Sequence, residues 1–199
     1  MRAADLEIYV ERYDQFCSLV SDSELFETGL SFKLIIDYNL MTLLKDSELD
    51  FLKNKNSFMA LPYVLRRTNS KVFDLAQKLE SESVIKGILL RNPEEIGHYT
   101  GHVSRNLKLI SDAGIYSFND NSISFLSGLV DEITLPIELN KGEKKGLLRS
   151  NETMGKERFS VMVYGRVPMM HTANCIRNTF GDCTGKRGGE VSYETIFIN

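Results

Sequence analysis

Two cysteines and a histidine lie close together in the sequence, and side chains of these types can bind metal ions or take part in catalysis. Cys175 and Cys183 are separated by seven residues, and His171 precedes Cys175 by four positions. That separation is wider than the roughly two to four residues usual between paired zinc ligands, and it is not a redox CxxC motif. Two interpretations stay open: ligands of a metal or cluster, with His171 as a further ligand, or ordinary thiols.

Cys175 and His171 also contain the atoms of a thiol nucleophile and its base. Such a pair needs a setting that stabilises the thiolate, and the spacing does not require this role. His98 and His102 share the same four-residue offset in a stretch flanked by glycines, which we interpret as a loop. No cysteine or paired acid accompanies them, so they are weaker metal candidates.

A carboxylate and a guanidinium each follow a predicted strand. Glu138 follows an apolar run at 132–135, and Arg166 follows another apolar run at 159–164. Catalytic groups of barrel enzymes lie at the carboxyl ends of the strands. Glu138 is therefore a candidate catalytic carboxylate, or else a salt-bridge or helix-start carboxylate for a charged helix at 141–149. Arg166 could hold a carboxylate or phosphate bidentately, or pair with Glu138.

Six apolar runs, separated by helical patterns, must position these residues. We predict strands at 32–36, 58–61, 84–90, 107–110, 132–135 and 159–164, and helices at 38–44, 69–82, 121–129 and 141–149. Nearly continuous apolar strands that alternate with helices indicate a parallel sheet with right-handed crossovers. The pattern does not distinguish an open sheet from a barrel. Arg91 and Asn119 also end or follow predicted elements, and we give them less weight.

The first 30 residues are predicted to form a helical segment that precedes an α/β domain at 31–199. Apolar residues recur at three- and four-residue steps over 5–20, which predicts an amphipathic helix. Cys17 lies on that apolar stripe, and we expect it to be a buried structural thiol.

Length and composition place the chain among single globular domains. The sequence has 199 residues and a net charge of −3, so no global charge attracts it to nucleic acid or to an anionic membrane. We find no transmembrane run and no secretory signal in the sequence. Three cysteines at irregular spacing do not make a disulfide framework, which favours a reduced, cytoplasmic protein. HExxH, GxSxG, P-loop and GxGxxG motifs are absent from the sequence.

A set of short stretches in order resembles one known family. VYGR at 163–166, then PMM at 168–170, then Cys175 resembles the signature region of peptidase family U-32, the collagenase-like peptidases. Four upstream stretches resemble family segments at plausible spacing: MALP at 59–62 with Arg66, GILLRN at 87–92, SFN at 117–119 and ITLPIELN at 133–140. The resemblance covers roughly 31–199. It implies a peptidase, a hydrolase, whose catalytic domain is a TIM-barrel-like (β/α) barrel.

Six predicted strands are fewer than the eight of a closed barrel. The expected fold class is therefore α/β, an incomplete or compact (β/α) barrel-like domain with mostly parallel strands. The resemblance also places a family glutamate at Glu138.

The resemblance implies a cofactor for the cysteines. Family members carry a cysteine quartet that holds an iron–sulfur cluster, and Cys175 and Cys183 match its first two positions. Ser192 stands where the family has a further cysteine before a tyrosine, and no cysteine follows Cys183. A cluster of this kind takes four thiolates, so either a partner or further sequence completes the ligand set, or the site has decayed.

The family allows three functions. The first is nominal collagenase-like proteolysis with a peptide substrate. The second is iron–sulfur-dependent modification of RNA or hydroxylation. The third is an inactive, shortened paralogue that binds a protein partner or another copy of itself. We expect no membrane partner in any of the three.

Overall fold

The computed structural model describes residues 6–27, 31–65, 70–101, 106–155 and 158–168. The chain divides into two compact units, 1–167 and 168–199. The first unit is an α/β domain, and the description that follows concerns that unit.

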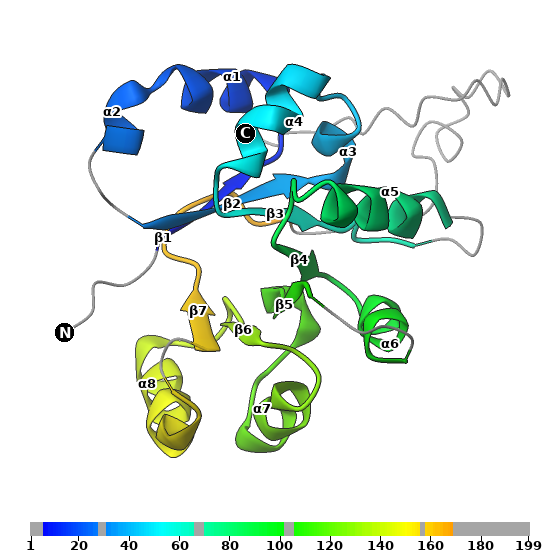
Figure 1. Cartoon of the computed structure of the whole chain (residues 1–199). Helices are drawn as coiled ribbons and strands as arrows, with labels where there is room; N and C mark the ends of the chain where they lie inside the picture. Colours follow the sequence, from blue (N-terminus) through cyan, green and yellow to red (C-terminus); the bar gives the residue numbers. More distant parts are fainter. Residues whose placement is uncertain (1–5, 28–30, 66–69, 102–105, 156–157, 169–199) are drawn as a thin grey trace, which may run out of the picture. The chain divides into compact units, whose positions relative to one another are not determined.

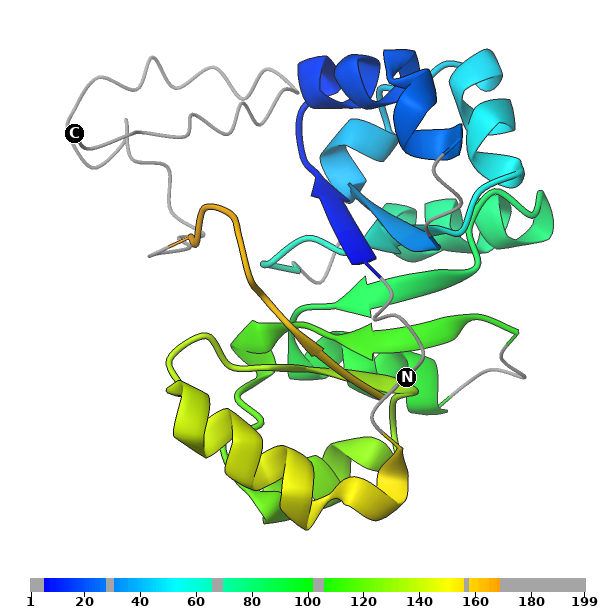
Figure 2. The ribbon, with the colours of Figure 1, turned by 90° about the vertical axis from the view of Figure 1, so that its left-hand side faces the viewer.

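Seven parallel strands form one sheet in sequence order (Figure 1). They are β1 (Leu6–Val10), β2 (Phe32–Asp37), β3 (Ser57–Ala60), β4 (Gly87–Leu90), β5 (Lys108–Ser111), β6 (Glu132–Leu135) and β7 (Phe159–Val161). Each strand is paired only with its neighbours in the chain, so β1 and β7 are the two edges of the sheet in the described residues (Figure 2). Because all strands run the same way, their carboxyl ends meet at one end of the sheet.

Helices connect successive strands. They are α1 (Tyr13–Ser21), α2 (Ser23–Glu27), α3 (Tyr38–Met41), α4 (Asp46–Lys53), α5 (Ser70–Ser81), α6 (Pro93–Gly101), α7 (Asp120–Ser127) and α8 (Lys141–Ser150), with short 3-10 turns at Ala113–Ile115 and Glu152–Met154. Asn140 shows how the sequence starts a helix: its side chain accepts hydrogen bonds from the amides of Gly142 and Glu143 at 2.8 and 3.0 Å.

The two faces of the sheet bury different sets of residues. The outer face packs against the helices through a large core that includes Leu34, Ile36, Met59, Leu90 and Leu109. The other face holds a smaller cluster of alternate residues from four neighbouring strands: Ile35, Phe58, Ala60, Leu89 and Ile110. β2, β3 and β4 are therefore buried on both sides, as their nearly continuous apolar sequences indicate.

A buried ion-pair cluster shows that the sheet is strongly curled. Lys33 Nζ on β2 lies 2.9 Å from Glu7 Oε1 on β1 and also pairs with Glu132 Oε2 on β6. β2 and β6 are separated by three strands in the sheet order, so a flat sheet could not bring these side chains together. Lys33 and Ile35 are two residues apart and share a face, which is therefore the concave face. The expected α/β fold, an incomplete (β/α) barrel, is confirmed.

The structure corrects several expectations. Residues 6–10 form β1, so the predicted helix over 5–20 is wrong there and correct only for α1. Leu6, Ile8 and Val10 alternate as a strand and pair with β2, but the same stretch also fits helical spacing because Leu6 and Val10 are four residues apart. Cys17 is exposed, not buried, because α1 turns Phe16 toward the core.

The region around His98 also differs from the prediction. His98 lies in the helix α6, not in a loop, and its ring stacks on Phe73 of α5 with 3.7 Å between the ring centroids. Tyr99 on the same helix is buried. Packing between α5 and α6 therefore overrides the helix-weakening effect of the glycines.

Candidate functional site

A buried arginine occupies the carboxyl end of β4. Arg91 follows the last residue of that strand, and only 2% of its side chain is exposed. Its Nη1 donates to Asp37 Oδ2 at 3.0 Å and to the carbonyl of Leu61 at 3.1 Å, and its Nη2 donates to the Tyr9 hydroxyl at 2.5 Å. These bonds join the carboxyl ends of β1, β2, β3 and β4.

Two tyrosine rings flank the guanidinium. The carbon of the guanidinium lies 3.9 Å from the ring centroid of Tyr63, in the loop after β3, and 5.0 Å from that of Tyr9. The Tyr9 hydroxyl also donates to Asp37 Oδ2 at 2.8 Å. Burial raises the pKa of Tyr63 to about 12 and raises that of Tyr9 further, so both phenols stay protonated near neutral pH.

Asp37 and Asp112 each use one carboxylate oxygen to accept a main-chain hydrogen bond and direct the other oxygen toward Arg91. Asp37 Oδ1 accepts from the amide of Asn39 at 2.9 Å, which starts α3, and leaves Oδ2 for Arg91. Asp112, after β5, accepts from the amide of Ala113 through Oδ1 at 2.7 Å, while Oδ2 lies 3.4 Å from Arg91 Nε. We call Tyr9, Asp37, Tyr63, Arg91 and Asp112 the Arg91 cluster.

One donor in the Arg91 cluster is not satisfied. The Nε–H of Arg91 is buried and makes no hydrogen bond among the described residues, although it lies within ion-pair distance of Asp112. The Asp112 side chain is 21% exposed, against 2% for that of Arg91. The unbonded Nε–H of Arg91 therefore lies beside the partly exposed side chain of Asp112 at the carboxyl end of the sheet, which we call the mouth of the barrel.

A buried carboxylate outside the Arg91 cluster, that of Glu95, fixes the main chain of Arg91. Glu95, on the first turn of α6, accepts from the amide of Arg91 at 2.6 Å and from the side-chain amide of Asn92 at 2.9 Å. Burial raises its pKa to about 7 against the opposing effect of these hydrogen bonds. Glu95 thus fixes the chain where β4 passes into α6, and Arg91 is held in place at its main chain as well.

The predicted site residues fall partly inside the described structure. Glu138 and Arg166 are both exposed; Glu138 follows the last residue of β6 by three positions and Arg166 follows the last residue of β7 by five. Asn119 caps α7 by accepting from the amide of Ser122 at 2.9 Å. Cys175, Cys183 and His171 lie outside the described residues.

The donor set of this chain does not complete a four-cysteine cluster. The sequence has three cysteines, and Cys17 is exposed on α1. Within the described ranges, no group of three or more His, Cys, Asp or Glu side chains is arranged to hold a metal ion. Ligands from another chain would be needed for a cluster of the kind that the resemblance implies.

Sequence patterns could have indicated most of the Arg91 cluster. Asp37, Arg91 and Asp112 each follow an apolar strand directly or after one residue, which is the signal that singled out Glu138 and Arg166. The sequence alone does not show the importance of Arg91, because its partners Asp37 and Asp112 are 54 and 21 residues away in sequence. Tyr9 was assigned to a helix, which hid its place at the end of β1.

No protein-family model, curated protein or solved structure matches the chain. In the part of the chain that the structure describes, no helix has both the length and the apolar character needed to cross a membrane.

Proposed function

We propose that this chain is a peptide-binding protein of the peptidase U-32 kind, with nominal proteolytic activity at the carboxyl end of its barrel. The ordered stretches that end in VYGR, PMM and Cys175 support the family, and the incomplete parallel (β/α) barrel agrees with the fold that the resemblance implies. The odd number of cysteines supports a reduced, cytoplasmic location.

The arrangement of Arg91 and Asp112 carries this proposal. A peptide bond offers one carbonyl acceptor and, nearby, one amide donor. The unbonded Nε–H of Arg91 can donate to the carbonyl, and the carboxylate of Asp112, whose side chain is partly exposed, can accept from the amide. The half-buried ring of Tyr63 covers the guanidinium, so the peptide must displace this ring to reach Nε.

The charge of the Arg91 cluster favours peptide over RNA. Two carboxylates surround one guanidinium, so the cluster is negative by one charge when both aspartates are ionised. Arg91 is already paired with Asp37 and lies within ion-pair distance of Asp112, so its positive charge is offset and attracts a phosphate only weakly. Nucleic-acid sites instead expose basic side chains to the phosphate backbone. The net negative charge of the Arg91 cluster therefore favours a peptide, particularly one with a basic residue, over RNA.

Glu138 and Arg166 are the candidates for chemistry beside the bound peptide. Both are exposed to solvent in the segments that follow two neighbouring strands, β6 and β7. In the proposed reaction Glu138 takes a proton from the attacking water, and Arg166 orients a carbonyl or carboxylate of the substrate. Asp37 and Asp112 are less suited to this role, because Arg91 lies between them and occupies one oxygen of each.

A cleavage assay tests the proposal. The full chain is incubated with fluorogenic gelatin peptides, and product is followed for the unaltered protein and for Glu138→Gln. We expect cleavage that falls by about a hundredfold or more in Glu138→Gln, the size typical for loss of a general base. Glu94→Gln, an exposed carboxylate on α6, is the matched control and should keep full activity. Equal rates in all three proteins, or no cleavage, would remove the proteolytic assignment.

A second candidate function rests on Cys175 and Cys183. Their match to the first half of the family's cysteine quartet supports a redox role in RNA modification or hydroxylation, with a partner that supplies the remaining ligands. Binding of a labelled RNA, with affinity that falls steeply as salt rises, would favour this candidate over the peptide.

A further inference from the structure

We infer that the open edge of β1 binds one extended, basic peptide segment as an added parallel strand. This inference rests on the proposed peptide-binding function, because it adds to the contact at Arg91 and Asp112 a second surface and a conformation for the bound peptide. It is carried by the hydrogen-bonding groups of the edge, the curl of the sheet and a hollow beside the strand.

The outward edge of β1 has main-chain groups that pair with no strand among the described residues. In a parallel pair, alternate residues direct their N–H and C=O groups to opposite edges. The amide of Leu6 donates to the carbonyl of Ser31, next to β2, so Leu6, Ile8 and Val10 bond toward β2. Glu7 and Tyr9 therefore direct their main-chain groups to the open edge, where an extended segment can pair with them.

The curl of the sheet indicates that a single strand fits. Lys33 pairs with Glu7 at one side of the barrel interior and with Glu132, on β6, at the other. A sheet closed to this degree by seven strands needs one more strand to reach the eight of a (β/α) barrel. A whole second sheet is not needed there, whereas one peptide strand supplies what is missing.

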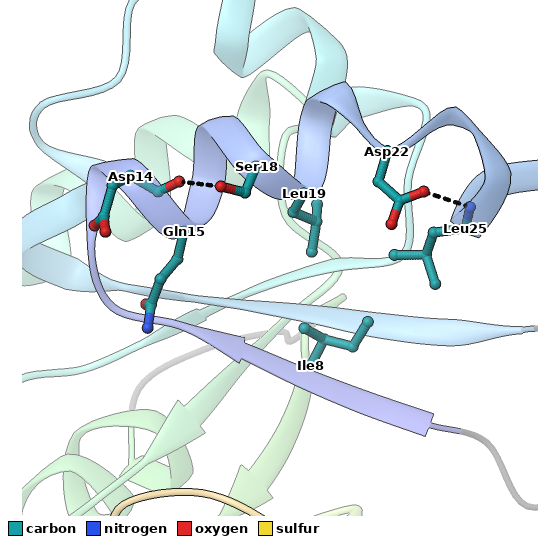
Figure 3. Close-up of a pocket in the computed structure, with 7 residues that line it drawn as sticks. All are labelled: Ile8, Asp14, Gln15, Ser18, Leu19, Asp22 and Leu25. Atoms are coloured by element: carbon teal, nitrogen blue, oxygen red, sulfur yellow. Dashed lines mark hydrogen bonds between the residues drawn. The ribbon is translucent and has the colours of Figure 1, made fainter.

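The hollow beside β1 suits a basic side chain (Figure 3). It has a volume of about 430 Å³ and is lined by Ile8 from β1 and by Asp14, Gln15, Ser18, Leu19, Asp22 and Leu25 from α1, α2 and the turn between them. Figure 3 shows Ile8, Leu19 and Leu25 pointing toward one another at the base of the hollow. Apolar side chains would bury the stem of a lysine or arginine.

Asp22 is the carboxylate that we assign to the basic head group. Asp14 is already paired with Arg12 at 2.6 Å, so its charge is offset. Asp22 uses Oδ1 to accept from the amide of Leu25 at 3.0 Å, which leaves Oδ2 for a ligand. Side chains of paired residues point to the same face of a sheet, so the peptide residue opposite Ile8 would place its basic side chain in this hollow.

Peptide probes test the strand geometry on the full chain. The probe is a labelled peptide of alternating valine and threonine with one central lysine, and binding is followed by fluorescence anisotropy. We expect N-methylation of the residues whose amides face β1 to abolish binding, and N-methylation of the alternate residues, whose amides face away from β1, to weaken it much less. Equal effects of the two registers would overturn the inference, because only an added strand distinguishes them.

Two further measurements locate the site. Hydrogen exchange should show the amides of Glu7 and Tyr9 exchanging quickly in the free chain and slowly with the lysine peptide. Protection already in the free chain would mean that the chain itself covers this edge, which would overturn the inference. Asp22→Asn keeps the Oδ1 acceptor and should weaken the lysine peptide by about two- to fivefold, the size of an exposed ion pair. Asp50→Asn on α4 is the control and should change nothing.

The outcome is separable from that of the cleavage assay. Cleavage that depends on Glu138 but is insensitive to the methylation register would leave the proposed function in place and remove this binding mode. Register-dependent binding without cleavage would leave the β1 edge as a peptide-binding surface and remove the proteolytic activity.

Discussion

Arg91 Nη1 donates to Asp37 Oδ2 over 3.0 Å and so ties the carboxyl end of β4 to that of β2 across the intervening β3. Only 2% of the arginine side chain and 8% of the aspartate side chain are exposed. Taking two such charges out of water is costly, and the pair is tolerated because each charge has further hydrogen bonds. The same contacts that stabilise the barrel mouth therefore also fix the geometry of the candidate site.

Removing the charge of Asp37 should destabilise the fold strongly. Asp37→Asn keeps an oxygen for the amide of Asn39 but leaves Arg91 as a buried charge without its closest anion. We expect a loss of about 3–5 kcal/mol in the free energy of unfolding, measured by urea denaturation. Asp50→Asn disrupts the exposed pair with Lys53 and should cost less than about 1 kcal/mol. Similar losses in the two variants would contradict a structural role for the Arg91 pair.

Gly87 is required by close packing in the barrel interior. A Cβ at this position would lie 2.3 Å from Cε1 of Phe58 and 2.4 Å from the carbonyl oxygen of Lys108. Both neighbours are constrained, since Phe58 is buried and the carbonyl belongs to the main chain of β5. Gly87→Ala should therefore lower the free energy of unfolding by at least about 1–3 kcal/mol, measured by urea denaturation.

Gly146 supplies the matched control for that substitution. It lies inside α8, and a Cβ there would meet nothing within 4 Å. Gly146→Ala should stabilise the protein by up to about 1 kcal/mol, because alanine loses less conformational entropy in a helix. Opposite signs are expected for the two alanine variants. A stabilised Gly87→Ala protein would show that the Phe58 ring is not confined as described.

Iron content tests the cofactor that the resemblance implies. Three cysteines cannot provide the four thiolates of a complete cluster, so the chain purified alone without oxygen should contain well under one cluster per chain. Cys175→Ser should lower bound iron and acid-labile sulfide further, whereas Cys17→Ser should not, because Cys17 lies exposed on α1. A full complement of iron in the chain alone, unchanged by Cys175→Ser, would contradict this donor set.

Local patterns predicted most of the sheet. The strand expected at 132–135 is β6 at the same residues, and the runs that predicted β2, β3, β4, β5 and β7 each overlap the observed strand. Apolar runs bounded by polar residues identify buried parallel strands because both faces of each strand are covered. Leu6–Val10 was missed because five residues with partial alternation fit a helix equally well, and only pairing with β2 decides between them.

The site was less predictable than the fold for a physical reason. The strand-end rule places Glu138 and Arg166 at the carboxyl end of the sheet, but it does not say which polar residues meet there. Contacts such as Arg91 with Asp37 depend on strand order and curl, which arise from long-range pairing. The roles of Glu138, Arg166, Cys175 and Cys183 stay predictions.

The ion-pair cluster in the barrel interior should give the protein a pH-dependent stability. Burial raises the pKa of Glu132 to about 7, and the neighbouring Glu7 carboxyl raises it as well, against the opposing effect of Lys33. A group whose pKa is higher in the folded state than in the unfolded state stabilises the fold fully below the unfolded pKa. That contribution is lost as pH rises through the folded pKa. The Glu132 contribution should therefore decline between roughly pH 4.5 and 7.

Substitution of Glu132 isolates this effect. Glu132→Gln resembles the protonated side chain at every pH, so its stability relative to the unaltered protein should increase as pH rises from about 5 to about 8 and then level off. Glu95 also has a raised pKa, but it is present in both proteins and cancels in the difference. Urea denaturation at several pH values measures the difference, with Glu94→Gln as a control that should show no such trend. A constant difference for Glu132→Gln would mean that Glu132 titrates as it does in the unfolded chain, and that Lys33 fully compensates its burial.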